Sequence, residues 1–252
     1  MATETLRLAR VEDGSIEVFS SLQGEGPFVG RPSTFVRTSS CNLQCFWCDT
    51  PYTWNWTGTD FAHRQGRKFD RETESAVIPI EDVAGHVARF GNRAIVLTGG
   101  EPMIQQRRLA ALPAAVEAEL GLPVVVDVET NGTLQPTPEF DAVVHHFVVS
   151  PKLTNSRLDP TLRIKPDVLR FFAQREGAFF KFVVGSTEEL AEVCAIVDDA
   201  GADRDRVYLM PEADDLDRLE QTQATVAALC LAEGFRFSDR LHVRLYGSRR
   251  GV

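Results

Sequence analysis

Residues 34–50 read TFVRTSSCNLQCFWCDT, a short apolar run followed closely by three cysteines. Three residues separate Cys41 from Cys45 and two separate Cys45 from Cys48, so one short loop carries all three thiols. A brief apolar, β-branched run bounded by turn residues is typical of a strand buried on both faces. The stretch therefore predicts a buried strand whose carboxyl end delivers three thiols to one small object, a metal ion or a cluster.

The same pattern recurs along the chain. Further apolar runs that end in polar or glycine-containing turns are Ile16–Ser20, Ala94–Leu97, Val124–Val128, Phe147–Val149, Phe179–Val184 and Val207–Met210. Helical patterns lie between them, at Glu81–Phe90, Gln105–Leu120, 160–173, Thr187–Ala200 and 214–233, and Pro113 and Pro166 are expected to break or kink two of them. Alternating strands and helices predict a parallel sheet. Because we count about six such units rather than eight, we expect an α/β fold that forms a partial (β/α)6-type parallel barrel.

The composition is that of an ordinary globular protein, with 252 residues, 43% apolar and 25% charged. We predict a single domain, residues 1–252, with an insertion at about 51–78. The net charge of −9 makes nucleic acid a poor partner, because phosphate backbones require a concentrated basic face. We also expect no membrane partner and a cytoplasmic location, since the sequence shows neither a long apolar run nor a secretory signal.

Cytoplasmic thiols are kept reduced, so five cysteines are expected to be metal ligands or core residues rather than disulfides. Cys194 and Cys230 each lie among apolar residues at helical spacing, which predicts two core positions. A closed zinc site would need a fourth ligand beside the trio, and the loop offers none. Three thiolates suit a four-iron cluster whose remaining iron accepts an outside ligand.

The insertion at 51–78 is aromatic and polar, and loops of this length usually have a function or structure of their own. We expect Trp54 and Trp56 to cover the cysteine loop as a lid, and a docking surface for a partner is the alternative.

The CxxxCxxC trio, together with TGGEP at residues 98–102, resembles the radical S-adenosylmethionine family. The resemblance implies that Cys41, Cys45 and Cys48 hold a 4Fe-4S cluster, that S-adenosylmethionine binds its open iron, and that a deoxyadenosyl radical then abstracts hydrogen from a substrate. It also implies that the cofactor lies against Gly99, Gly100 and Glu101, where glycine permits close approach of the backbone.

Further motifs narrow the resemblance. They are SLQGEGPFVGRPSTFVR at 21–37, CNLQCFWCDT at 41–50, ETNG at 129–132, SPK at 150–152 and HVRLYG at 242–247. Within the radical family they are similar to the ring-contracting lyases that convert 6-carboxy-5,6,7,8-tetrahydropterin to 7-carboxy-7-deazaguanine, with loss of ammonia, in queuosine biosynthesis. That similarity implies a need for Mg²⁺, an electron donor such as a flavodoxin, and a homodimer.

The resemblance also implies roles for individual residues. The pterin substrate is expected to contact Gln23, Glu25, Arg37, Thr98 and His242, with Thr50 as a Mg²⁺ ligand and Asp49 as the second choice. Amide and carboxylate groups suit the edge of a pterin, and a guanidinium suits its carboxylate. The alternatives are an ion pair to a neighbouring strand for Arg37 and a core position for His242.

Polar residues at the ends of later strands complete the expected site. Asp127 and Glu129 alternate on one face of an apolar strand, so that face must meet donors, cations or a ligand. We assign Glu129 to the cofactor and regard Asp127 as structural, and by resemblance Ser150 and Lys152 also bind the cofactor. Lys152 is alternatively a counter-ion for Glu129. Lys181, inside FFKFVV, requires a partner.

Two other functions compete with this one: a different radical enzyme, such as a glycyl-radical activase, and a non-enzymatic iron–sulfur or zinc module. An activase needs a groove for a protein, and a zinc module lacks iron absorbance. The QGEG loop at 23–26 favours a small pterin. The final SRRGV is either a frayed tail or an ordered segment near the substrate.

Overall fold

The computed structural model describes residues 4–252, in which ten strands form one continuous sheet. Neighbouring strands run parallel from β3 to β10 in the order β3-β5-β6-β7-β8-β9-β10. These strands are β3 (Pro32–Thr38), β5 (Ala94–Gly99), β6 (Val125–Thr130), β7 (His146–Val149), β8 (Ala178–Val184), β9 (Val207–Pro211) and β10 (Arg236–Phe237). The predicted α/β fold is confirmed, and the parallel strands form a large sheet that is not closed into a full barrel, in keeping with the expected partial (β/α)6-type barrel.

Three antiparallel strands extend the sheet beyond β3. β1 (Thr5–Ala9) lies between β3 and β4 (Ser75–Pro79), and β2 (Val18–Leu22) pairs with β3. The predicted strand at Ile16–Ser20 is β2, shifted by two residues, whereas β1, β4 and β10 were not predicted. β4 lies at the end of the 51–78 insertion, and its pairing with β1 makes that end part of the sheet.

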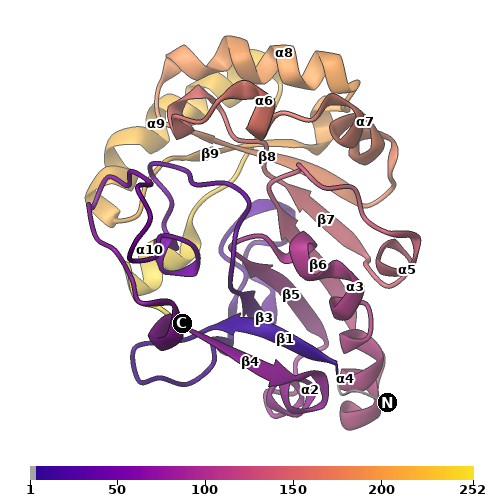
Figure 1. Ribbon diagram of the computed structural model, residues 1–252. Helices are drawn as coiled ribbons and strands as arrows, with labels where there is room; N and C mark the ends of the chain where they lie inside the picture. The colour runs from indigo at the N-terminus through magenta and orange to yellow at the C-terminus, as the bar shows by residue number, and fades with distance from the viewer. Residues whose placement is uncertain (1–3) are drawn as a thin grey trace.

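Helices cover the outer face of this curved sheet, as Figure 1 shows, with α6 to α9 over β8 and β9 and with α3 to α5 beside β5 to β7. The α-helices are α1 (Arg71–Glu74), α2 (Ile80–Ala88), α3 (Gln106–Leu109), α4 (Leu112–Leu120), α5 (Pro138–Asp141), α6 (Pro160–Arg163), α7 (Pro166–Gln174), α8 (Leu190–Ala200), α9 (Leu216–Glu233) and α10 (Leu241–Tyr246). Short 3₁₀ turns are η1 (Gly26–Phe28), η2 (Pro51–Thr53), η3 (Pro102–Gln105), η4 (Thr154–Ser156), η5 (Thr187–Glu189) and η6 (Arg204–Arg206).

Proline divides two of the predicted helices, as expected. Pro113 lies in the first turn of α4 and Pro166 in the first turn of α7, positions where a missing N–H costs nothing. The predicted 105–120 helix is therefore η3, α3 and α4, and the predicted 160–173 helix is α6 followed by α7. None of the helices formed by residues 4–252 combines the length and apolar character needed to cross a bilayer.

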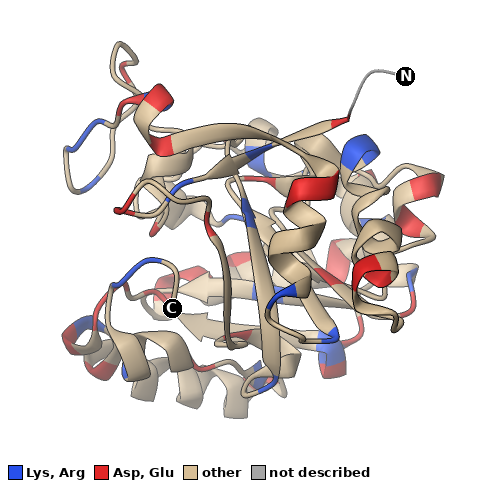
Figure 2. Cartoon of the chain, turned by 90° about the horizontal axis from the view of Figure 1, so that it is seen from below, with Lys and Arg blue, Asp and Glu red and all other residues tan. Residues whose placement is uncertain are grey.

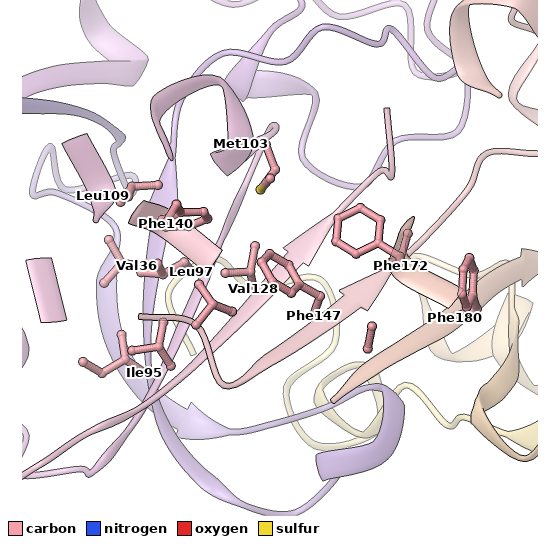
Figure 3. Packing of buried hydrophobic residues seen from close by; sticks show 14 of the residues in the cluster. Val36, Ile95, Leu97, Met103, Leu109, Val128, Phe140, Phe147, Phe172 and Phe180 are labelled. Atoms are coloured by element: carbon pink, nitrogen blue, oxygen red, sulfur yellow. The ribbon is translucent and has the colours of Figure 1, made fainter. Parts of the chain in front are cut away.

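The main core lies between the sheet and the outer helices. Val36, Leu97 and Val128 lie on three adjacent parallel strands, in one apolar layer that continues to Phe147 and Phe172 (Figure 3). These side chains are almost completely excluded from water. The opposite, inner face of the sheet is left for polar groups, and Asp127 on this face pairs with Arg31 and with His146, the structural role expected for it.

Charged residues are spread over the periphery of the molecule. In the view of Figure 2, acidic and basic segments are interspersed along the outer helices and loops. The C-terminus and α10 lie on the side of the sheet away from α7 and α8 (Figure 1). They help to enclose the inner face, where the polar motifs converge.

Candidate active site

A cavity of about 490 Å³ opens at the carboxyl ends of the parallel strands. In α/β sheets this edge is where sites are built, because loops from several strands meet there. The predicted site residues that line it are Gln23, Glu25, Arg37, Cys41, Cys45, Cys48, Thr50, Thr98, Gly99, Gly100, Glu129, Ser150, Lys152 and His242. Residues from most of the chain thus meet around one space, and Glu101 is the predicted site residue that does not line it.

The three thiols occupy the loop that follows β3. Cys41 Sγ accepts a hydrogen bond from the backbone N–H of Leu43 at 3.4 Å, and Cys48 Sγ accepts one from Trp54 Nε1 at 3.3 Å. Donors aimed at sulfur favour the thiolate, the form that binds iron. Burial raises the pKa of Cys45 to about 12 despite the nearby Lys152 ammonium, so iron binding must displace a proton. The loop fits a cluster held by three sulfurs.

The other two cysteines are structural. Cys230 is buried in the main core, and the half-buried Cys194 packs against that core, as the sequence predicted. Neither Cys194 nor Cys230 lines the cavity.

The two glycines of TGGEP let their backbone approach the cysteine loop closely, in addition to facing the space where a ligand would bind. A Cβ on Gly99, whose φ is +138°, would lie 2.1 Å from Thr38 O, and one on Gly100 would lie 2.3 Å from Ser40 O. The Gly100 and Glu101 N–H groups donate to Thr38 O and Ser40 O at 3.1 and 2.9 Å. The motif therefore fixes the chain that enters the cysteine loop, and both glycines also face the cavity.

Glu101 is buried beneath this motif, and the protein itself satisfies its carboxylate. Thr130 Oγ1, Asn131 N and Met103 N donate to it at 2.8, 2.7 and 3.0 Å. Burial raises the pKa of Glu101 even though these donors oppose the shift. Its side chain joins the end of β5 to the end of β6, which is a positioning role and differs from the direct cofactor contact that we expected.

Glu129 lies at the end of β6 and joins two other predicted site residues. It accepts hydrogen bonds from Gln23 Nε2 at 3.1 Å and from Thr98 Oγ1 at 2.8 Å. The loop after β2 and the ends of β5 and β6 are therefore held in one network. Lys152 forms no ion pair with Glu129 among residues 4–252; its Nζ donates to Ser150 Oγ at 3.0 Å and lies 5.5 Å from the Trp47 ring centre.

Glu25 is the centre of a buried charge cluster that also contains Lys181 and Arg240. Its Oε2 pairs with Lys181 Nζ, and its Oε1 accepts from Arg240 Nε at 3.1 Å. Burial alone would raise the pKa of Glu25, but the two cations outweigh it and hold that pKa well below its usual range. Lys181 thus has the partner that its apolar surroundings required, and Glu25 stays ionised.

Arg240 extends the charge cluster to the cysteine loop, because it also pairs with Asp49 Oδ2. His242 Nε2 lies 3.8 Å from Glu25 Oε1, and burial lowers the pKa of this histidine. Sequence reasoning missed Arg240, and nothing in its local sequence identifies it, since its partners lie far away in the chain. Thr50 Oγ1 lies 3.6 Å from Cys48 Sγ, at the same edge of the cavity.

Arg37 lines the cavity and also forms an ion pair with Glu17. Its Nε donates to Glu17 Oε1 at 2.7 Å, and Tyr52 OH lies 3.0 and 3.1 Å from the two oxygens of the same carboxylate. The alternative expected for Arg37, an ion pair beside its strand, is therefore confirmed. Because Arg37 lines the cavity and pairs with Glu17 through Nε, the ion pair and a substrate contact are compatible.

The insertion and the C-terminal tail enclose the cavity together. Trp54 contacts Cys48 as expected for a lid, whereas Trp56 instead packs beside Tyr52, Phe69 and Ala9. The tail residues 247–252 line the cavity. Arg250 anchors them through Glu74 at 2.8 Å and by lying 3.5 Å from the Tyr52 ring centre, so the ordered alternative for the tail is confirmed.

Comparison with known proteins agrees with this geometry. Residues 22–167 match the family model of a 4Fe-4S single cluster domain. A 7-carboxy-7-deazaguanine synthase of Pyrobaculum aerophilum is 38% identical over 94% of this chain and 96% of its own length, and one of Rhodopirellula baltica is 33% identical over 100% and 94%.

A solved structure gives the same result at the level of the fold. The crystal structure of QueE from Escherichia coli superposes with a TM-score of 0.64 at 25% identity, and the match covers 94% of this chain and 95% of that one. These similarities favour a ring-contracting lyase over the other functions considered from the sequence.

Proposed function

The chain belongs to the 7-carboxy-7-deazaguanine synthase family, and from this premise we propose how its cavity carries out the reaction. It is a radical S-adenosylmethionine enzyme of queuosine biosynthesis, a lyase that converts 6-carboxy-5,6,7,8-tetrahydropterin to 7-carboxy-7-deazaguanine and ammonia. The observation that carries the assignment is that the three cysteines and the QGEG loop, distant in sequence, line the same cavity.

Cys41, Cys45 and Cys48 hold the 4Fe-4S cluster, and Gly99, Gly100, Ser150 and Lys152 line the wall beside it, where we propose that S-adenosylmethionine binds. When bound, the cluster and the cofactor would supply the radical chemistry that removes hydrogen from the substrate. The residues of this chain supply position and exclude water. Glu101 contributes by holding the ends of β5 and β6 in register.

Gln23, Glu25 and Thr98 form the proposed pterin contact. A pterin presents donors and acceptors along one edge, and Glu25, kept ionised by Lys181 and Arg240, is an acceptor with a fixed orientation. Glu129 orients Gln23 and Thr98 through the two hydrogen bonds described above, so it acts on substrate and cofactor alike. His242, close to Glu25, lines the remaining part of this wall.

Arg37 is the proposed receptor for the substrate carboxylate, because guanidinium and carboxylate form bidentate pairs. Glu17, which itself accepts from Tyr52 OH, holds Arg37 through Nε, so its two terminal nitrogens are not needed for this anchor. This anchoring reduces the conformational entropy that Arg37 loses when substrate arrives.

We propose Thr50 as a ligand of Mg²⁺, with Asp49 nearby as the second candidate. A hydroxyl, substrate oxygens and water suit this hard cation. Thr50→Ala should weaken the response of turnover to Mg²⁺, about tenfold in the half-saturating concentration if the ligand is worth about 1.4 kcal/mol. The iron content should not change. An unaltered Mg²⁺ titration would remove Thr50 from the site.

Other aspects of the function extend the family resemblance. We propose that residues 1–252 act as one domain, that the enzyme works in the reducing cytoplasm as a homodimer, and that an electron donor of flavodoxin type supplies the reducing electron. Sedimentation of the reconstituted protein tests the dimer.

The decisive experiment is anaerobic reconstitution with iron and sulfide, followed by incubation with dithionite, S-adenosylmethionine, Mg²⁺ and the carboxytetrahydropterin. We expect release of ammonia together with carboxydeazaguanine, detected by mass spectrometry. Reconstituted Cys45→Ala protein is the matched control. Absence of both products from protein with a full cluster would overturn the assignment.

A further inference from the structure

A second cavity, of about 420 Å³, lies on the other side of the segments that lead into the cysteine loop and out of TGGEP. Ser39 and Ser40 form part of its wall, together with Ile104 from η3. Arg7 from β1 and Arg107 and Arg108 from α3 provide its charge. The proposed pterin and cofactor contacts do not involve any of these side chains.

The charge of this cavity differs from that of the whole molecule. The chain has 36 acidic and 27 basic residues, yet no carboxylate is among the residues that line this cavity. Within residues 4–252, the three arginines also form no ion pair, and Arg107 and Arg108 are exposed. Solvent-facing guanidinium groups such as those of Arg107 and Arg108 are available to carboxylates of a partner, whereas Arg7 is half-buried and donates to Ser75 Oγ at 3.3 Å.

The cavity lies directly behind the cluster-binding loop. Ser40 lines this second cavity, and the next residue, Cys41, lines the active site, so their Cα atoms are about 3.8 Å apart across one peptide bond. Gly100 lies against the same loop, since a Cβ there would be 3.1 Å from Cys41 Cβ. A wall formed by residues 39–41 and 99–103 therefore separates the second cavity from the cluster site.

An exposed apolar residue also indicates a protein surface. Ile104 is 45% exposed next to the arginines, which gives an apolar centre to a basic rim.

Taken with the proposed function, which requires electrons at the cluster, the geometry points to this basic surface, Arg7, Arg107, Arg108 and Ile104, as the docking site of an acidic one-electron carrier protein. The reduced carrier loses one electron and the cluster held by Cys41 gains it, without proton or atom transfer. Because the net charge of the chain is −9, an acidic carrier is repelled by most of the surface, and a local basic patch directs it to the wall behind the cluster.

The test compares reduction by a protein with reduction by a small molecule. The variant is Arg107→Glu/Arg108→Glu in the reconstituted protein, and the carrier is a reduced flavodoxin. We expect the second-order rate constant of cluster reduction, followed by visible absorbance, to fall at least tenfold at low salt. The affinity of flavodoxin in a calorimetric titration should fall similarly. Reduction and turnover with dithionite should be unchanged.

The matched control is Arg89→Glu/Arg93→Glu. It makes the same change in net charge with two exposed arginines, and Arg93 immediately precedes the amino end of β5. Equal losses in both double variants would show that only net charge matters and would overturn the docking site, as would an unchanged flavodoxin rate in Arg107→Glu/Arg108→Glu. Inorganic phosphate that binds at the arginines without displacing flavodoxin would also overturn it and identify a small-anion site.

If dithionite also failed to support turnover in the wild-type protein, the proposed function would fall. If dithionite supported turnover but flavodoxin failed to reduce the cluster in the wild type and in both double variants, the proposed function would stand and the docking site alone would be overturned.

Discussion

The cysteine loop and the charge cluster around Glu25 are built in different ways, although they line the same cavity. Cys41, Cys45 and Cys48 come from eight consecutive residues, and the loop carries its own geometry. Glu25, Lys181 and Arg240 come from three distant regions, and 215 positions separate Glu25 from Arg240. The first is a local motif and the second exists only when the sheet has formed.

This difference predicts how substitutions in each region affect iron binding, substrate binding and stability. A motif whose ligands are adjacent in sequence is lost when one ligand is removed, but the rest of the fold continues to pack. A buried group of charges from separate strands connects those strands, so removing one member affects both substrate binding and stability. The predictions below test this contrast.

The largest effect is expected for Cys45→Ala, which should reduce cluster iron to background because three sulfurs are the minimum that the loop provides. Iron content and visible absorbance measure this, and circular dichroism checks the fold. Cys230→Ser is the matched control, because Cys230 lies in the core and away from the cavity. Loss of iron from that control would contradict a three-ligand site.

Lys181→Met should have the opposite pattern, with the cluster retained and the substrate site lost. It leaves Glu25 buried beside one cation instead of two, so we expect a loss of about 3–5 kcal/mol in the free energy of unfolding. A displaced Glu25 should lower turnover by about 10²-fold. Denaturant titration and steady-state kinetics measure the two effects. Lys165→Met is the control. If Lys181→Met had wild-type kinetics, the charge cluster would not be part of the substrate site.

The pH dependence of stability should identify Glu25 as a member of the charge cluster. Its folded-state pKa lies below the unfolded-state value of about 4.3, so the stabilisation is complete above that value and is lost as pH falls through the folded-state pKa. The difference in unfolding free energy between the wild type and Glu25→Gln should therefore be constant near neutral pH and shrink in acid. Urea titrations from pH 7 to pH 3 measure it.

The exposed Glu119 offers a control for that experiment, since Glu119→Gln should leave the profile unchanged. A Glu25→Gln difference that grows as pH falls would contradict the ionised state of Glu25.

The smallest effect is expected for Tyr52→Phe, which removes one donor to Glu17 but leaves the Arg37 ion pair in place. A hydrogen bond to a charged group contributes about 1.5–3 kcal/mol to stability. We expect KM for the pterin to rise several-fold with kcat nearly constant, because Arg37 becomes less well oriented for binding. Tyr246→Phe is the control. A fall in kcat at unchanged KM would exclude this positioning role.

The parallel strands were predictable because each is a short apolar run, buried on both faces and followed by turn residues. β1 and β4 were not predictable, since each becomes a strand by pairing with the other. In β1, Leu6 and Leu8 face the core while Arg7 faces away, and this alternation is too short to identify a strand by itself. β10, with two residues, depends wholly on its neighbour β9. Strands defined by their partners carry little signal of their own.

The same limit applies to the active site. CNLQCFWCDT and TGGEP were enough to predict that three thiols and a glycine turn would meet at the carboxyl edge of a parallel sheet, because spacing and strand ends are local properties. Three sets of contacts emerge only in the folded chain: Arg240 pairs with Glu25 and Asp49, Glu17 anchors Arg37, and Glu101 supports the wall instead of facing the cavity. Such contacts join charges that are far apart in the sequence. A buried charge requires a partner, but its own sequence neighbourhood does not identify which residue that partner is.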